Sequence, residues 1–102
     1  MIARVASFEG VNVEVAKRTM DQADELIRPM LEGLDGYEGH LDLIAPNGHV
    51  LSITLFDSQE DAEAAEPTFD EEMPRQLGHL FKDWEGRRVS VERYDVIAES
   101  RS

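Results

Sequence analysis

The sequence predicts one α+β domain built from four strands and two helices. Residues that favour strands gather in four short stretches, which indicates a small sheet. Apolar residues recur at steps of three and four in two longer stretches, which indicates two amphipathic helices. The 102 residues are enough for a single hydrophobic core and too few for two.

The N-terminal third predicts a strand followed by a helix. Strand-favouring residues run over 2–8. Asn12 suits the N-cap of the helix that follows, and Gly33 and Gly36 suit its end. The apolar stripe of this helix consists of Ala16, Met20, Ala23, Ile27, Met30 and Leu34.

A hairpin follows, and its register can be predicted from its turn. Pro46-Asn47 suit the centre of a type I turn with Gly48 in the left-handed region, so that Ala45 pairs with His49. This register separates apolar from polar residues, whereas a one-residue slip mixes them. The apolar face carries Leu41, Leu43, Ala45, Leu51, Ile53 and Leu55. The opposite face carries His40, Asp42, Ile44, Val50, Ser52, Thr54 and Phe56.

The second helix is expected to begin at the N-cap residue Ser58. Pro67 interrupts it, and Thr68 with Glu71 forms a capping box that restarts it before Gly86 ends it. Its apolar stripe consists of Phe69, Met73, Leu77, Leu80, Phe81 and Trp84. The acidic stretch between residues 57 and 72 is interpreted as a solvated helix face.

The last strand is expected over 89–98, so the domain spans 1–98 and residues 99–102 form a disordered tail. Strand, helix, strand, strand, helix, strand is the order of the ferredoxin-like fold, an antiparallel sheet with two helices on one face. Because two helices cover only one face, the apolar hairpin face needs another partner. A second copy of the chain is the simplest one, so we expect a homodimer through the sheet faces.

The amino-acid composition excludes several classes of partner and of chemistry. Twenty-two acidic residues against ten basic ones give a net charge of −12, which repels nucleic acid and anionic membrane surfaces. The chain has no cysteine, so disulfides, thiolate metal sites and a cysteine nucleophile are excluded. No signal segment or bilayer-length apolar stretch is visible, so a cytoplasmic location is expected.

Two segments resemble the antibiotic biosynthesis monooxygenase family. Leu34-Asp35-Gly36-Tyr37-Glu38-Gly39 matches the family's Gly-aromatic-x-Gly pattern before the second strand. The stretch from Ser52 to Ala62 matches a strand that ends in an aromatic residue and is followed by acidic-Ser-x-Glu-x-Ala. The resemblance implies a dimeric α/β barrel with a cavity beneath the helices, and oxygenation of aromatic compounds without a cofactor. The haem-degrading branch has Asn where Ala6 stands and Trp near Ala65, so haem degradation is not implied.

The candidate site lies on the polar hairpin face. His40 and Asp42 share this face, with Thr54 opposite His40 and Ser52 opposite Asp42, and Arg4 of the first strand lies on the same side. One hypothesis makes His40 a general base and Arg4 an anion or carbonyl anchor. The alternative is an internal Arg4–Asp42 ion pair beside a partly exposed His40. The residues predicted to bind ligand are Arg4, Asp42, Ser52, Thr54, Phe56, Phe69 and Trp84.

Two other candidate sites, a metal site and His79, have weaker support in the sequence. His40 and Asp42 suit a first-row metal, but no third ligand stands at a telling spacing, so no metal site is predicted. His79 lies roughly 200° around the helix from the apolar stripe and is expected to face solvent. Two functions remain: a cofactor-independent monooxygenase acting on a small apolar or aromatic ligand through a carbanion, and a non-catalytic homodimeric module that binds a small molecule.

Overall fold

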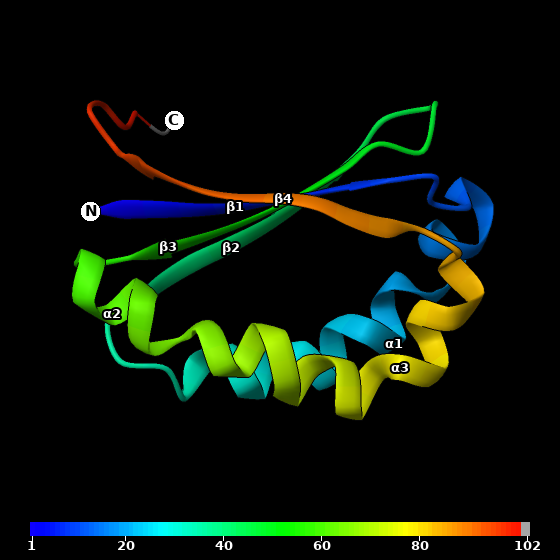
Figure 1. Cartoon of the computed structure of the whole chain (residues 1–102), viewed down its shortest axis with the longest axis horizontal. Coiled ribbons are helices and arrows are strands. Elements are labelled where there is room, and N and C mark those ends of the chain that lie inside the picture. The colour runs from blue at the N-terminus through cyan, green and yellow to red at the C-terminus, as the bar shows by residue number, and fades with distance from the viewer. Residues whose placement is uncertain (101–102) are drawn as a thin grey trace.

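The computed structural model describes residues 1–100, which form a sheet covered on one face by helices (Figure 1). The sheet is antiparallel with strand order β2-β3-β1-β4. Its strands are β1 (Ile2–Glu9), β2 (Tyr37–Ile44), β3 (Val50–Phe56) and β4 (Arg87–Asp95). The helical layer comprises α1 (Val13–Glu32), α2 (Gln59–Ala64), the short π-helical segment η1 (Thr68–Glu72) and α3 (Met73–Trp84). The predicted ferredoxin-like α+β fold is confirmed.

The N-cap of α1 and the hairpin turn have the local structure that the sequence predicts. The Asn12 side chain accepts a hydrogen bond from the Val15 N–H at 3.2 Å, which caps α1. In the turn, the Ala45 N–H donates to the His49 carbonyl at 2.8 Å, and Gly48 has a φ of +86°. A side chain at Gly48 would also lie 2.6 Å from the Val11 carbonyl oxygen, so glycine is required twice over. The predicted register is confirmed: Asp42 pairs with Ser52.

The second helix differs from the prediction at Pro67. Ser58 caps α2 by accepting from the Asp61 N–H at 3.2 Å, as expected. The chain then stays helical through Pro67, and the Thr68 N–H donates to the Ala65 carbonyl at 3.0 Å. The predicted capping box at Thr68 is wrong, because the wider turn of η1 replaces the break that such a cap requires.

The last helix-to-strand connection also differs. Glu85 takes the left-handed conformation that ends α3, with a φ of +66°, and Gly86 packs instead against Val11. Strand β4 starts and ends earlier than the predicted 89–98, and its register shifts opposite the Ser7/Phe8 step of β1. Residues 101–102 of the expected tail lie outside the described residues.

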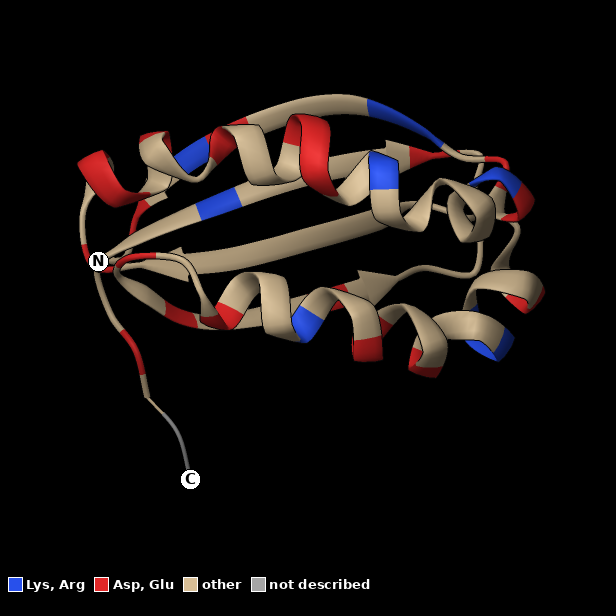
Figure 2. Ribbon diagram, turned by 90° about the horizontal axis from the view of Figure 1, so that it is seen from below, with Lys and Arg blue, Asp and Glu red and all other residues tan. Residues whose placement is uncertain are grey.

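The two faces of the sheet have different surroundings. Between the inner face and the helices lies a core of Ala23, Ile27, Leu31, Phe56, Ala62, Ala65, Phe69, Met73 and Leu77. On the outer face, Leu41 and Leu43 remain 54% and 44% exposed. Acidic residues recur along the helical layer (Figure 2). No helix of residues 1–100 is long and apolar enough to cross a membrane.

Candidate ligand-binding cavity

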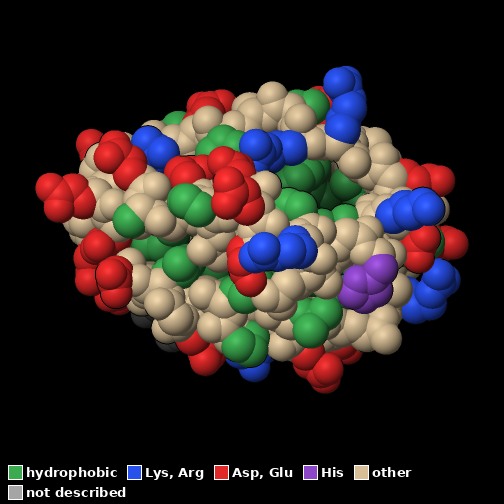
Figure 3. All heavy atoms as spheres, turned by 60° about the horizontal axis from the view of Figure 1, so that its bottom comes forward, with side chains coloured by type: hydrophobic (Ala, Val, Ile, Leu, Met, Phe, Trp, Pro, Cys, Tyr) green, Lys and Arg blue, Asp and Glu red, His purple; other side chains and the backbone are tan. Residues whose placement is uncertain are grey.

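A cavity of about 560 Å³ lies between the inner sheet face and helices α1 and α3. Figure 3 shows it as a hollow with hydrophobic walls and basic side chains at its edge. Most of its lining is apolar or aromatic: Phe8, Val11, Met20, Phe69, Met73, Phe81 and Trp84. The sheet contributes the polar residues Arg4, His40, Asp42 and Ser52. This volume and this mixture of surfaces are typical of sites for small organic molecules.

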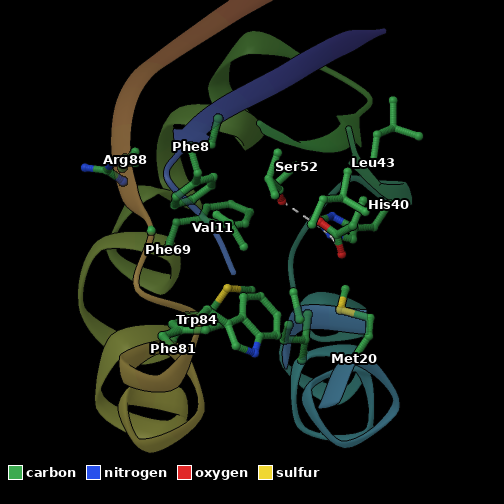
Figure 4. Close-up of a pocket in the computed structure, with 18 of the residues that line it drawn as sticks. Phe8, Val11, Met20, His40, Leu43, Ser52, Phe69, Phe81, Trp84 and Arg88 are labelled. Atoms are coloured by element: carbon green, nitrogen blue, oxygen red, sulfur yellow. Dashed lines mark hydrogen bonds and ion pairs between the residues drawn. The ribbon is translucent and has the colours of Figure 1, made fainter. Parts of the chain in front are cut away.

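His40 lies in a chain of hydrogen bonds on the sheet face. Its Nε2 is 3.0 Å from Asp42 Oδ2, and its Nδ1 is 2.8 Å from Thr54 Oγ1. Ser52 Oγ lies 3.5 Å from Nε2, which is the contact drawn from Ser52 in Figure 4. The register of β2 and β3 creates this cluster, because it places His40 opposite Thr54 and Asp42 opposite Ser52. Both ring nitrogens of His40 are therefore engaged.

Arg4 is almost completely buried, at 2% exposure, yet it lines the cavity. Its Nε lies 2.9 Å from Glu66 Oε1 and its Nη2 lies 3.3 Å from Glu66 Oε2, a two-point ion pair. The guanidinium also stacks 3.8 Å from the centre of the Phe69 ring. The ion pair between Arg4 and Asp42 weighed from the sequence is wrong, because Glu66 is the partner of Arg4 and His40 is the partner of Asp42.

Glu66 is one residue of this site that the sequence reasoning missed. It belongs to the acidic stretch that was interpreted as solvated. A signal was present, because Glu66 lies four residues after Ala62 and three before Phe69, both of which are buried on the inner side. Helical spacing thus places this one carboxylate beside the apolar stripe.

The helical side of the cavity is held together by Trp84. Its indole Nε1–H donates to Thr19 Oγ1 at 2.7 Å, and the Thr19 hydroxyl donates to the Val15 carbonyl at 2.8 Å. The Phe81 ring packs against the indole with centroids 5.2 Å apart. Figure 4 shows Trp84, Phe81 and Met20 facing the sheet across the cavity. The hydrogen bond to Thr19 joins α3 to α1 and fixes the indole.

Two of the predicted ligand-binding residues do not line the cavity. Thr54 is fully buried and directs its hydroxyl to His40. Phe56 is fully buried and packs edge-on against Phe69, with ring centroids 6.5 Å apart. Both contact residues that do line it. Arg4, Asp42, Ser52, Phe69 and Trp84 are brought together there, as is His40, while His79 is exposed on α3 as predicted.

The margin of the cavity carries charges that the sequence reasoning did not single out. Lys17 of α1, Asp70 of η1 and Arg88 of β4 all contribute to its lining. Arg88 Nη1 lies 2.8 Å from Asp70 Oδ1, so this pair links β4 to η1. Within residues 1–100, no group of three or more His, Asp or Glu side chains is placed to hold a metal ion.

The comparisons with known proteins found similarity to solved structures. No protein-family model and no curated protein matches the chain. A putative antibiotic biosynthesis monooxygenase from Deinococcus radiodurans superposes over 100% of this chain and 97% of its own, with a TM-score of 0.63 and 16% identity. A dimeric ferredoxin-like protein from an uncultured marine organism covers 100% of both chains, with a TM-score of 0.65 and 15% identity. The fold is ferredoxin-like.

A third solved structure, from Mycobacterium tuberculosis, covers 99% of this chain and 100% of its own, with a TM-score of 0.59 and 13% identity. At these identities the shared feature is the arrangement of strands and helices. The chemistry has to be argued from the cavity itself, because one fold carries many functions.

Proposed function

We propose that the chain binds a small aromatic ketone in the cavity and oxygenates it without a bound cofactor. The observation that carries this proposal is the combination of an aromatic-walled cavity of about 560 Å³ with a hydrogen-bonded His40–Asp42 pair on its sheet side. Such walls suit a planar apolar ligand, and such a pair suits the removal of a proton. The solved monooxygenase-like structure with the same fold adds support by analogy.

The polar residues suit a carbon acid, which is a methylene made acidic by a carbonyl group. The His40–Asp42 pair takes a proton, and the electron pair spreads onto the carbonyl oxygen. Glu66 engages Nε and Nη2 of Arg4, which leaves Nη1 to donate to that oxygen. Arg4 and His40 both pair with Thr54, so two strand spacings, roughly 10 Å, separate them, a span that a fused tricyclic ligand covers.

Molecular oxygen then serves as the oxidant. The carbanion attacks dioxygen and gives a hydroperoxide, which loses water. One methylene and one dioxygen thereby become one carbonyl group and one water, so atoms and electrons balance. The aromatic walls keep bulk water from the carbanion before oxygen reaches it.

We further propose that the protein works as a cytoplasmic homodimer joined through the outer sheet face. This face is the apolar side of the hairpin, where Leu41 and Leu43 are half exposed. Isolated apolar side chains are common on surfaces, but a contiguous row along two strands is typical of an interface. The solved ferredoxin-like neighbour from the marine organism is dimeric.

Oxygen uptake with anthrone tests the proposed reaction, since anthrone is a tricyclic ketone with an acidic methylene. We expect the protein to consume one dioxygen per anthraquinone formed. Met20→Trp should fill the cavity and abolish uptake, whereas Leu26→Trp, at an exposed position of the same helix, should not. No uptake above the buffer rate with anthrone and related ketones would refute the oxygenase.

A non-catalytic binding module is the second candidate. The observation that favours it is the internal pairing of the polar groups, with Arg4 on Glu66 and His40 on both Asp42 and Thr54. Under this function, anthraquinone raises the melting temperature of the wild type but not of Met20→Trp, and no oxygen is consumed. The two measurements together separate the two candidates.

A further inference from the structure

We infer that Asp42, and not His40, is the group that takes the proton from the ligand, and that His40 is a positioning residue. This inference rests on the proposed proton abstraction in the cavity. It assigns different roles to two residues that the sequence could only place side by side. The inference is drawn from the hydrogen bonds around the imidazole.

The first step is the tautomer of His40. An ionised carboxylate only accepts hydrogen bonds, so the Nε2 atom 3.0 Å from Asp42 Oδ2 must carry a proton. In a neutral imidazole the single lone pair then lies on Nδ1. The opposite tautomer would set the Nε2 lone pair against the carboxylate, with only the Ser52 hydroxyl at 3.5 Å to compensate.

The second step is the direction of that lone pair. His40 Nδ1 is 2.8 Å from Thr54 Oγ1, and Thr54 is fully buried beneath the cavity surface. The Thr54 hydroxyl therefore donates to Nδ1. The basic nitrogen of His40 faces the interior of the sheet layer, so a ligand in the cavity cannot deliver a proton to it without breaking both hydrogen bonds.

The third step is the position of Asp42. Asp42 lines the cavity, and its side chain is 24% exposed against 12% for His40. His40 holds Oδ2, which leaves Oδ1 as the oxygen that faces a ligand proton. A carboxylate is a competent base for a carbon acid when the resulting enolate oxygen is stabilised, which is the part proposed for Arg4.

The proton transfer then balances within the site. The carbon–hydrogen bond of the ligand breaks, and an oxygen–hydrogen bond forms on Asp42 Oδ1. The electron pair stays on the ligand and spreads to its carbonyl oxygen. His40 keeps its own proton on Nε2 throughout and holds the carboxylate in place.

Hydrogen–deuterium exchange of anthrone without oxygen tests this assignment, because it follows proton abstraction separately from oxygenation. NMR in buffered D₂O gives the exchange rate of the methylene above the buffer rate. Asp42→Asn should lower this rate by about 100-fold or more. His40→Gln should keep it within about threefold, because the Gln side chain can donate to Asp42 and accept from Thr54. His40→Ala should lower it by about tenfold, so that Gln rescues what Ala removes.

Exposed positions on α3 supply the matched controls, His79→Gln and Asp83→Asn, which should leave the rate unchanged. If Asp42→Asn does not fold, Asp42→Ala with added formate replaces it, and formate should restore exchange. Loss of exchange in His40→Gln with retention in Asp42→Asn would overturn the assignment, as would equal loss in both or no exchange by the wild type. Exchange without oxygen uptake would refute the oxygenase while sustaining the role of Asp42.

Discussion

The inner and outer faces of the sheet come from the same strands, yet they have opposite characters. On β2, His40 and Asp42 point to the cavity and are mostly buried, while their neighbours Leu41 and Leu43 belong to the outer face and are about half exposed. Leu43 also contributes to the lining of the cavity. A single-residue offset separates the two sets, since successive side chains of a strand alternate between faces. The hairpin turn at Gly48 therefore fixes the site and the apolar surface together.

The two faces also differ in whether their side chains need hydrogen-bond or ion-pair partners. Among the described residues, no buried side-chain nitrogen or oxygen lacks a hydrogen-bond partner. The inner face reaches this state through the Arg4–Glu66 pair and the chain from Asp42 through His40 to Thr54. On the β2–β3 part of the outer face the side chains are apolar, with Leu41 and Leu43 about half exposed, and the proposed second copy would cover them instead. Substitutions on the inner face should lower the stability of the fold, whereas substitutions on the outer face should weaken the proposed dimer.

The largest effect is expected from Glu66→Gln on the inner side. The change leaves the buried Arg4 guanidinium without its counter-charge, which should lower the free energy of unfolding by about 3 kcal/mol. Urea denaturation measures this difference. The matched control is Glu63→Gln, an exposed carboxylate 3.8 Å from Arg93, which should cost far less. Equal losses in the two variants would show that the Arg4–Glu66 pair does not hold the inner face.

On the outer face, Leu41→Asp should weaken the proposed dimer. A charge placed in an apolar interface has no partner there, so we expect the dimer dissociation constant to rise by about 100-fold. Sedimentation equilibrium gives that constant. The control is Leu26→Asp. Leu26 is also an exposed leucine but lies on α1, so this change should leave the dimer dissociation constant unchanged. A dimer of undiminished stability in Leu41→Asp would place the interface elsewhere.

A smaller effect is expected where α1 and α3 meet. Thr19→Val removes the acceptor of the Trp84 indole N–H and should lower the free energy of unfolding by about 1 kcal/mol. Thr19→Ser keeps the hydroxyl and should retain most of that stability. Thermal unfolding of the two variants at one pH makes the comparison. If Val proves no worse than Ser, the indole is fixed by packing alone.

The smallest effect is expected at the exposed Glu38. Its hydrogen bond and its repulsion with the Asp57 carboxyl raise the pKa of Glu38 above the usual 4.5. A raised carboxyl pKa means that the folded state binds more protons than the unfolded state, so this contribution to stability falls as pH rises through that range. Glu38→Gln should therefore melt slightly higher than the wild type at pH 7, with no gain at pH 4.

The control for Glu38 is Glu25→Gln, which makes the same change in net charge on the exposed side of α1. Melting curves from pH 4 to pH 7 compare the two variants. A pH-independent difference, or the same gain in both, would assign the effect to overall charge and not to Asp57.

Local patterns were sufficient for the features that depend on near neighbours in sequence. The N-caps Asn12 and Ser58 and the hairpin register follow from residues within a few positions of one another. The register in turn placed His40 beside Asp42, Ser52 and Thr54. These contacts are fixed by strand geometry, so the sequence could predict them.

The features that were missed depend on contacts between distant segments. The Arg4–Glu66 pair joins residues 62 positions apart and depends on where α2 meets β1. No short sequence motif predicts the π-helical turn at η1 or the left-handed conformation of Glu85. The direction of the His40 lone pair required knowing which ring nitrogen meets Thr54 and which meets Asp42, and the strand register alone does not give this.

Methyl NMR during a ligand titration tests the division between the two faces most directly. With anthraquinone-2-sulfonate as the probe, we predict shifts of the Ala6, Met20 and Met73 methyl signals, whose residues line the cavity. The Leu41 and Leu55 methyl signals on the outer face should stay in place. Shifts confined to Leu41 and Leu55 would contradict the account, because they would make the apolar outer face the ligand site.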